Sequence, residues 1–440
     1  MYGDAAAYWS LARSFVVDGH FSLAGYGDLL RGYSVPLFLH GVQRGAQILA
    51  VDEILLFRIV SALMGAALFT MALPTLISRI FNVQPSLFTT AVFSLLSVAF
   101  WHDHFLYSLS DFPALLLLTV GLLCLPRSIT DSWDLVSAVT SGVCLALAAN
   151  ARPIYAVSLL AAVVLVGAYL ARGATQRRVA AALIAFPIGI AVALLPQARI
   201  NSRTLGTPSP FAHGRTAPKL PNLYVQQLAW GVVIQRYETN IGPSFPVAVM
   251  FLDPAGKALM PDDSLPDPRA SIARSRVSVR SYARLVVQHP VFFVLAYSRH
   301  LFNGLDVAYT SPYVRRIAPR SALIAFANYV ILGLAAVQGL ARIRRVRVRD
   351  HGWQLAIAAT FILAALLAIP TAIECRFMLP IWMLMYGFVV FDVLGGGSAL
   401  VRPWWTVPVV ALCAVACFWL AASTYAHILD APRFELWSLW

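Results

Sequence analysis

Charged residues are scarce in this 440-residue chain, at 12% of the sequence. A soluble domain carries about 25% charged residues. Here 59% of the residues are hydrophobic, and the mean hydropathy is +0.73. This composition excludes an ordinary soluble protein and predicts a multi-pass membrane protein. Because apolar runs account for most of the length, we do not expect a large separate soluble domain.

Several chemical signatures are also missing. Four of the five cysteines lie inside apolar runs and no Cys-x-x-Cys occurs, which argues against a disulfide framework and a thiolate metal site. The start, Met1 to Asp4, lacks the basic and apolar regions of a signal peptide. There is no Gly-rich phosphate loop, so a nucleotide substrate is not expected. No internal repeat of roughly 20–50 residues is visible.

A membrane-spanning helix needs about 20 apolar residues. The runs predict an all-α, polytopic helix bundle of about ten spans. The predicted spans are Ile54–Ile80, Ser86–Trp101, Phe112–Leu125, Leu135–Ala149, Ile154–Ala171, Val179–Ala198, Ser321–Ala341, Trp353–Ile373, Phe377–Leu394 and Trp404–Ser423.

Arginines predict the orientation of the bundle. Short loops at 172–178 and 342–349 are rich in Arg and fall on the same side of the membrane, which the positive-inside rule makes cytoplasmic. The net charge of +13 therefore indicates anionic membrane lipid as a partner, and not nucleic acid. We expect the protein in the cytoplasmic (inner) membrane.

The predicted organisation has four parts. Residues 1–53 form an outer loop with two short interfacial helices, and residues 54–198 form a first membrane bundle. Residues 199–320 are an outer, mostly irregular region with an amphipathic helix at Val277–Tyr297. Residues 321–440 form a second membrane bundle. An outer loop at the start suggests that a preceding span is missing from this chain; the alternative is that Met1 is authentic.

Unusual polar clusters all follow or precede apolar runs on the side opposite the Arg-rich loops. Ionisable residues at such positions are costly, and this predicts a functional site facing the periplasm or exterior. The clusters are Gly3-Asp4, His102-Asp103-His104, Ser110-Asp111, Asn150-Ala151-Arg152-Pro153 and Glu374-Cys375-Arg376-Phe377.

Each acidic candidate also has a structural interpretation. Asp4, with Tyr8 one turn later, could act as a general base or could simply cap a helix. Asp111 could bind a sugar or cap the next helix. His102, Asp103 and His104 could bind substrate or lie in a solvated loop. Adjacent residues on one helix diverge, so a divalent metal there is compatible with the sequence but less favoured.

Arg152 and Arg376 each lie between two apolar runs. Arginine suits phosphate because its planar guanidinium donates paired hydrogen bonds and keeps its charge. For Arg376, the structural alternative is an ion pair with Glu374 that only balances charge. A base, hydroxyl-binding side chains and arginines on one face together predict group transfer from a lipid-phosphate donor.

Five segments resemble the GT-C glycosyltransferases, multi-pass enzymes that use polyprenyl-phosphate sugars. The segments are Gly3-Asp4 with Tyr8, Arg31 to Leu37, Tyr107 to Pro113, Ala149 to Tyr155, and Glu374 to Pro380. The last segment is similar to the Glu-x-Arg-Phe-x-x-Pro segment of eukaryotic mannosyltransferases. The resemblance covers most of the chain.

The resemblance implies that Asp4 is the catalytic carboxylate of an inverting glycosyltransferase. The substrate-binding candidates are Tyr8, Arg31, His102, Asp103, His104, Asp111, Arg152, Glu374 and Arg376. The donor would be a polyprenyl-phosphate sugar and the acceptor a glycan, lipid or protein hydroxyl. Two departures leave the sugar open: Ala5 follows Asp4 in place of a second acid, and Ala372-Ile373 stands where mannosyltransferases have His-Lys.

Two other function classes fit a multi-pass chain. A transporter or lipid flippase would place polar groups near the middle of the membrane, and an essential residue at the centre of Leu135–Ala149 would favour it. A non-catalytic subunit of envelope assembly would tolerate Asp4→Asn.

Overall fold

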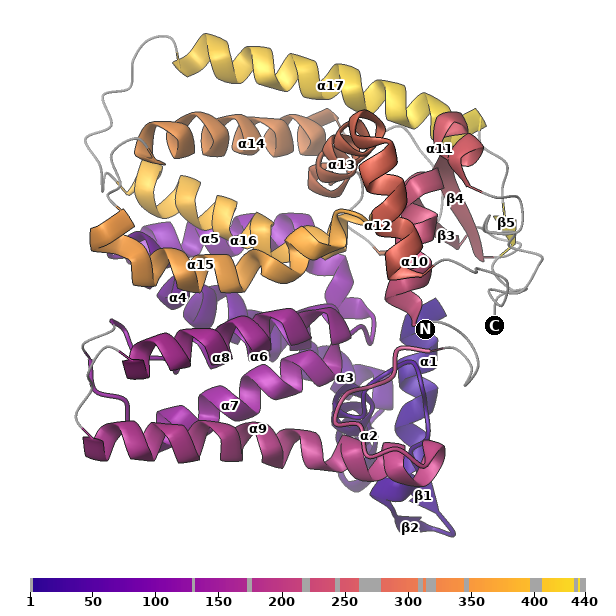
Figure 1. Cartoon of the computed structure of the whole chain (residues 1–440), viewed down its shortest axis with the longest axis vertical. Coiled ribbons are helices and arrows are strands. Elements are labelled where there is room, and N and C mark those ends of the chain that lie inside the picture. The colour runs from indigo at the N-terminus through magenta and orange to yellow at the C-terminus, as the bar shows by residue number, and fades with distance from the viewer. Residues whose placement is uncertain are drawn as a thin grey trace.

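The protein is a bundle of long, roughly parallel helices with a smaller helical and stranded region at one end (Figure 1). The computed structural model describes residues 3–128, 131–171, 176–215, 222–241, 246–260, 278–307, 312–313, 322–343, 348–395, 406–430 and 434–435.

The first half of the chain begins outside the long helices and then enters them. Its elements are α1 (Gly3–Leu11), β1 (Val16–Val17), β2 (His20–Phe21), α2 (Ser34–Leu49), α3 (Glu53–Ala66), η3 (Ala67–Ala72), α4 (Leu73–Phe81), α5 (Leu87–Trp101), η4 (His102–Leu106), α6 (Asp111–Leu123), α7 (Leu135–Ala151), η5 (Pro153–Tyr155), α8 (Ala156–Ala171) and α9 (Gln176–Leu205).

The second half returns to the bundle after an outer region. Its elements are α10 (Leu223–Val233), β3 (Ile234–Ile241), β4 (Pro246–Leu252), α11 (Pro254–Leu259), α12 (Val279–Gln288), α13 (Pro290–Leu305), α14 (Ala322–Ile343), α15 (Val348–Ala368), η8 (Cys375–Met378), α16 (Leu379–Gly387), η9 (Phe388–Leu394), α17 (Thr406–Asp430) and β5 (Phe434–Glu435).

Seven described helices are long and apolar enough to cross a membrane, so this is a multi-pass membrane protein. Six of them bury only 22% to 39% of their apolar window, and their remaining sides are free to face lipid. The seventh, Cys375–Asp392, is 67% buried and therefore lies at the centre.

The predicted total of ten spans is not confirmed. The predicted spans 86–101, 112–125 and 135–149 are helical, but α5, α6 and α7 have only 15, 13 and 17 residues. At 1.5 Å per residue, α6 extends about 20 Å, which is short of the ~30 Å hydrocarbon layer. Arg79 of α4 caps the end of α6. Its guanidinium donates hydrogen bonds to the carbonyl oxygens of Leu122, Leu123, Leu125 and Pro126.

The two ends of the bundle carry different elements. The end of α8 and the start of α9, and likewise the junction of α14 and α15, lie at one end of the bundle, on the left in Figure 1. The N-terminus, α1, α2 and the strands lie at the other end. The helix ends that flank the two Arg-rich segments are therefore separated from α1 and α2 by the length of the spanning helices.

The outer region is more ordered than predicted. Residues 199–320 were expected to be mostly irregular, yet β3 pairs antiparallel with β4, and β4 with β5. These short strands are a small addition to a bundle that is otherwise helical, as predicted. The run from Pro246 to Leu252 is rich in Val and Phe, which favour strands. The predicted helix Val277–Tyr297 is also divided, because Pro290 cannot donate to the preceding turn and instead begins α13.

Candidate active site

Asp4 lies in the first turn of α1 and directs its carboxylate to two arginines. Its Oδ1 accepts a hydrogen bond from Arg31 Nη2 at 2.7 Å, and its Oδ2 accepts one from Arg376 Nη2 at 3.5 Å. The Ala5 N–H, at the start of α1, donates to the Tyr313 hydroxyl at 3.1 Å. The carboxylate of Asp4 is thus held by side chains from distant parts of the chain.

Arg31 reaches Asp4 from the loop that precedes α2. Its side chain is only 8% exposed, and its guanidinium lies 5.1 Å from the centre of the Tyr8 ring. The backbone of this loop is fixed by the Tyr26 hydroxyl, which donates to the Arg31 carbonyl at 2.8 Å. Burial raises the pKa of Tyr8, so its phenol stays protonated beside the arginine.

Arg376 connects three carboxylates. It donates to Glu374 from Nε at 2.7 Å, to Asp111 from Nη1 at 3.4 Å and to Asp4 from Nη2 at 3.5 Å. Its contacts therefore extend well beyond the local pair with Glu374 that the sequence left as an alternative. The 3₁₀ turn η8 projects it from the start of the most buried spanning segment.

Arg152 completes the cluster. It forms an ion pair with Asp111, and its guanidinium lies 4.9 Å from the centre of the Phe377 ring. Asp111 is 2% exposed and Arg152 16%. Among the described residues Asp111 is the single carboxylate that Arg152 pairs with, whereas Arg376 pairs with three. Arg152 therefore has fewer carboxylate partners than Arg376, and its side chain is more exposed than that of Arg31, at 16% against 8%.

We call this group the Asp4 cluster: three acids and three arginines, whose formal charges cancel. Its members are Asp4, Asp111, Glu374, Arg31, Arg152 and Arg376. Asp4 is the most accessible acid, at 35% exposure, against 2% for Asp111 and 18% for Glu374. A molecule arriving from outside the bundle would meet Asp4 before the other carboxylates.

The electrostatics of Asp4 combine two opposing effects. Burial disfavours its charged form, but the positive charges of Arg31 and Arg376 outweigh burial, so the pKa of the Asp4 carboxyl lies below its ordinary value. Asp4 is consequently ionised at neutral pH. A carboxylate held in this state can accept a proton only when the field of the arginines is weakened.

The His102-Asp103-His104 segment does not join the cluster as a unit. His102 Nε2 lies 3.2 Å from Asp103 Oδ1, and the two side chains are 53% and 28% exposed. His104 is buried, with its ring 5.1 Å from Trp101 and 6.1 Å from Phe112. Adjacent side chains diverge in direction on the 3₁₀ turn η4, which explains the separation.

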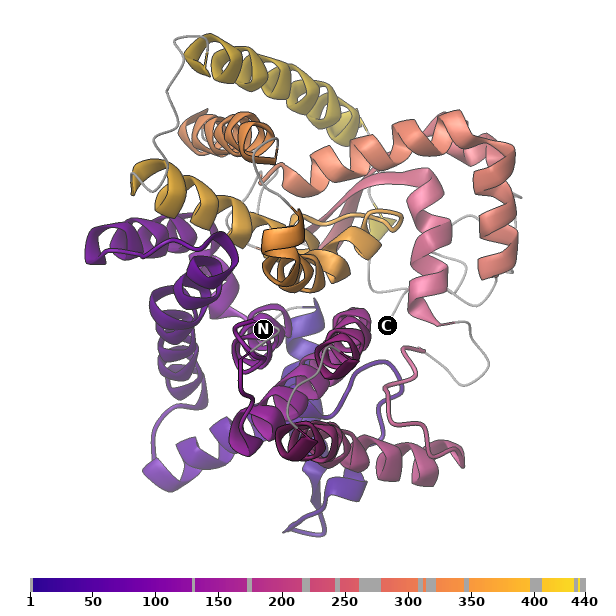
Figure 2. The ribbon, with the colours of Figure 1, turned by 60° about the vertical axis from the view of Figure 1, so that its left-hand side comes forward.

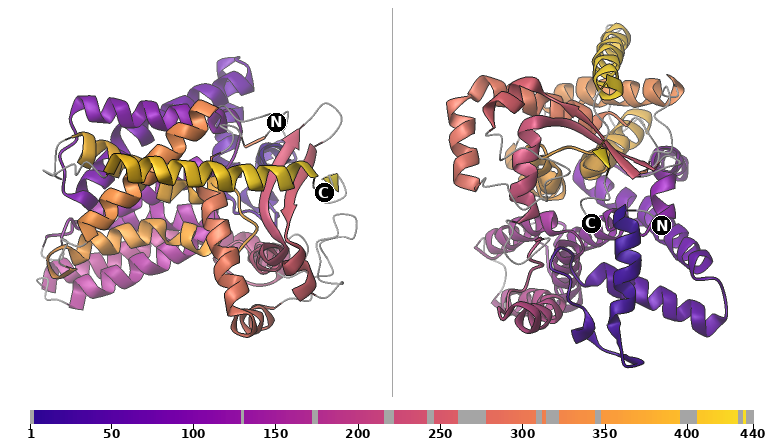
Figure 3. Two further views of the ribbon diagram at one scale, coloured as in Figure 1. Left: turned by 90° about the horizontal axis from the view of Figure 1, so that it is seen from above. Right: turned by 90° about the vertical axis from the view of Figure 1, so that its right-hand side faces the viewer.

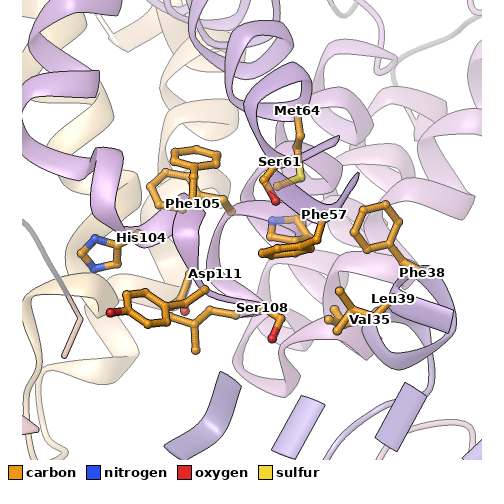
Figure 4. Close-up of a pocket in the computed structure, with 14 residues that line it drawn as sticks. Val35, Phe38, Leu39, Phe57, Ser61, Met64, His104, Phe105, Ser108 and Asp111 are labelled. Atoms are coloured by element: carbon orange, nitrogen blue, oxygen red, sulfur yellow. The ribbon is translucent and has the colours of Figure 1, made fainter. Parts of the chain in front are cut away.

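A narrow, mostly apolar crevice lies between α2, α3, η4 and α6, and Asp111 is one of the residues that line it (Figure 4). Its walls include Phe57 and Met64 of α3, with Ser61 between them. The same helix exposes Leu63 at 66%, so the crevice borders an apolar outer face. The remaining lining residues are Val35, Phe38, Leu39, His104, Phe105, Tyr107, Ser108, Leu109, Phe112 and Pro113.

A buried amide ladder supports the Arg31 loop from behind. Asn150 Oδ1 accepts from the Ser34 N–H at 2.9 Å, and Asn150 Nδ2 donates to Gln197 at 3.0 Å. The Tyr33 N–H also donates to Gln197 at 3.2 Å. Because Asn150 is two residues from Arg152, this ladder ties the two arginine segments together. Gln197 was not predicted from sequence: it lies at the end of an apolar run with no motif around it.

No three His, Cys, Asp or Glu side chains come together as a potential metal-ligand set in the described residues. Each carboxylate of the Asp4 cluster instead faces an arginine. The comparisons with known proteins add no family: no protein-family model matches the chain, and no curated protein or solved structure is detectably similar to it.

Proposed function

We propose that this protein is an inverting glycosyltransferase that moves a sugar from a polyprenyl-phosphate donor to an acceptor hydroxyl. One observation carries the proposal: an accessible carboxylate, Asp4, lies beside Arg31 and Arg376 at one end of a membrane helix bundle. This combination offers a proton acceptor and phosphate-binding groups at the depth where a lipid-linked substrate exposes its head. The acceptor is a glycan, lipid or protein.

In this mechanism the acceptor oxygen attacks the anomeric carbon from the face opposite the phosphate. The new carbon–oxygen bond forms as the bond to the phosphate oxygen breaks, and its electron pair leaves with the polyprenyl phosphate. Asp4 takes the hydroxyl proton as the bond forms. Inversion follows from this single displacement. Phosphate leaves readily, so no separate general acid is required.

Donor binding would also make Asp4 a better base. The donor is a phosphodiester with one negative charge. Its phosphate oxygens would accept hydrogen bonds from the guanidinium groups that otherwise donate to the carboxylates. Weakening the pull of Arg376 on Asp4 would raise the pKa of Asp4 from its depressed value. Asp4 would therefore become a stronger base when the donor is bound.

Arg152 is our choice for the main phosphate contact. It is paired with one carboxylate, Asp111, and part of its side chain is exposed. The leaving polyprenyl phosphate gains negative charge during the reaction, and a fixed guanidinium stabilises the growing charge more strongly than the starting one. Arg376 would share this role from the opposite side of Asp111.

The crevice at Asp111 offers a place for the start of the prenyl chain. It is lined by aromatic side chains such as Phe57, Phe105 and Phe112, and also by Asp111, the acid that pairs with Arg152. An isoprenoid there would keep its phosphate next to the cluster. The positive-inside rule assigns this end of the bundle to the exterior or periplasm.

The test is sugar transfer by the purified full-length protein with a panel of polyprenyl-phosphate sugars. Asp4→Asn and Arg376→Ala should each lower turnover at least ~100-fold, the scale of a general base or of one oxyanion-stabilising group. Asp18→Asn, at an exposed position with the same chemical change, is the matched control and should keep full activity. Equal, measurable turnover by wild type and Asp4→Asn would reject Asp4 as the base. Absence of turnover by the wild type with every donor would reject the proposal and favour a non-catalytic subunit.

A further inference from the structure

The helices α12 and α13 form a bent pair with one buried face. Tyr282 of α12 and Tyr297 of α13 share a hydrogen bond of 2.7 Å between their hydroxyls. Phe293 packs at the bend, with its ring 5.7 Å from Tyr282 and 5.6 Å from Tyr297. This packing fixes how the two helices are rotated, and therefore which side chains point outward.

The outward faces of the pair are apolar and basic. On α13, Val291 is 72% exposed, Val294 64% and Leu295 57%, and the three form one stripe at helical spacing. On α12, Arg280 and Arg284 are exposed one turn apart, and Val287 beside them is 78% exposed. We call these six residues the α12–α13 surface. A water-facing helix would not normally carry so many exposed large apolar side chains together.

The location of this surface matches the edge of a membrane. The spanning helices run horizontally in Figure 1, whereas α12 runs across them at the end that carries the N-terminus and the strands. From above, α12 and α13 lie at the side of the molecule where the spanning helices end, and not over the centre of the bundle (Figure 3). Figure 2 shows the same pair at the periphery, with α13 leading outward from the bundle and α12 turning away from it.

We propose that the α12–α13 surface binds an anionic phospholipid membrane. The apolar stripe of α13 inserts at the boundary of acyl chains and headgroups, and Arg280 and Arg284 of α12 bind the headgroup phosphates. This division follows the physics of interfacial helices, in which buried apolar area and attraction to acidic lipid act together. The proposal concerns the membrane and is independent of the glycosyltransferase reaction.

The experiment uses the full-length protein in lipid nanodiscs, with an environment-sensitive fluorescent amino acid incorporated in place of Val294. The discs contain phosphatidylcholine alone or with phosphatidylglycerol, and lipid brominated on the acyl chain serves as the quencher. The matched control carries the probe in place of Ala258, which is exposed on α11 and lies outside the α12–α13 surface.

We expect the brominated lipid to reduce Val294-site emission roughly twofold and to leave Ala258-site emission unchanged, because only the former touches acyl chains. Phosphatidylglycerol should increase the quenching. Arg280→Glu with Arg284→Glu should remove this increase, whereas Arg280→Lys with Arg284→Lys should keep it, since charge is retained. Equal, weak quenching at both sites would overturn the proposal. A water-shielded but unquenched Val294 site would overturn it as well and would indicate a protein partner.

Discussion

At the scale of single residues, the state of Asp4 depends on its arginines. Since the folded-state pKa of Asp4 is lowered, its ionised form stabilises the folded protein at pH values above about 4, and this contribution is lost as the pH falls below that value. The proposed base is therefore charged over the whole neutral range. The arginines set how far into acid the activity persists.

Replacing Arg31 tests this dependence. Arg31→Met removes the nearest positive charge while the opposing effect of burial remains, so the pKa of Asp4 should rise. We expect the acid limb of kcat/KM against pH to move to higher pH in Arg31→Met and to stay near its original position in Arg31→Lys. A profile that does not move in Arg31→Met would contradict the proposed role of Asp4 as the base.

Arg152 is tested through the donor. Arg152→Leu alone would leave Asp111, which is 2% exposed, without its closest partner. The informative variant is therefore Arg152→Leu with Asp111→Asn, which removes both charges. We expect the KM for the polyprenyl-phosphate sugar to rise about tenfold or more, equivalent to ~1.4 kcal/mol, with the thermal midpoint near that of wild type. An unchanged KM would remove Arg152 from the phosphate site.

Asp103 was a substrate-binding candidate by sequence, and the structure places its carboxylate 3.2 Å from His102 Nε2 at a partly exposed position. An exposed pair of this kind contributes roughly 0–1 kcal/mol. We expect Asp103→Asn to keep turnover and KM within about twofold of wild type in the same transfer assay, the scale of a surface substitution. A large loss of activity would show that substrate reaches η4.

At the scale of elements, the loop that carries Arg31 depends on a close backbone approach to α7. A Cβ added at Gly32 would lie 2.0 Å from the carbonyl oxygen of Asn150, so neither backbone can remain in place. The loop and the end of α7 touch here because glycine leaves the space. The distance between Arg31 and Asp4 is set by this contact.

Gly32→Ala should therefore displace Arg31 and lower transfer activity at least ~10-fold, since a displacement near 1 Å has large effects on catalysis. The matched control is Gly27→Ala in the same loop, where the added Cβ would meet Thr204 at an ordinary 3.6 Å. We expect Gly27→Ala to keep activity. Thermal melting of both variants separates loss of the site from loss of the fold, and equal activity of the two would contradict the positioning role.

At the scale of the whole molecule, the bundle separates two chemically different ends. The Arg-rich junctions lie at one end, and Asp4 and the strands lie at the other. By the positive-inside rule, the Arg-rich end would face the cytoplasm. It would place the Asp4 cluster outside the cytoplasm, where a lipid-linked sugar and an envelope acceptor can meet.

Cysteine labelling in whole cells tests the orientation. Ser132→Cys lies between α6 and α7 at the Arg-rich end, and Ala258→Cys lies on α11 at the other end; both positions are exposed. A membrane-impermeant maleimide should label Ala258→Cys in intact cells and Ser132→Cys only after permeabilisation. The unsubstituted protein corrects for its five native cysteines. The reverse pattern would put the cluster in the cytoplasm.

Sequence alone determined the multi-pass membrane character of the chain and the places of the seven long apolar helices that the structure describes. These properties depend on local hydropathy, because the bilayer core accommodates apolar helices whose backbone groups are hydrogen-bonded internally. The side of the membrane on which each cluster emerges stays a prediction. The sequence could not predict that Arg376 would join three carboxylates, because Asp4, Asp111 and Glu374 are brought together only by packing between distant helices.

Tertiary structure alone also decided which candidates stay apart. Asp103 follows one apolar run and Asp111 precedes the next, and the structure places Asp111 against Arg152 and Arg376 but His102 beside Asp103. The strands β3 and β4 and the bend at Pro290 were likewise missed, since pairing partners and helix breaks in the outer region depend on its own small core. The sequence shows which residues are costly to bury. Only the folded bundle determines which of them are in contact, because contacts between distant residues depend on three-dimensional packing.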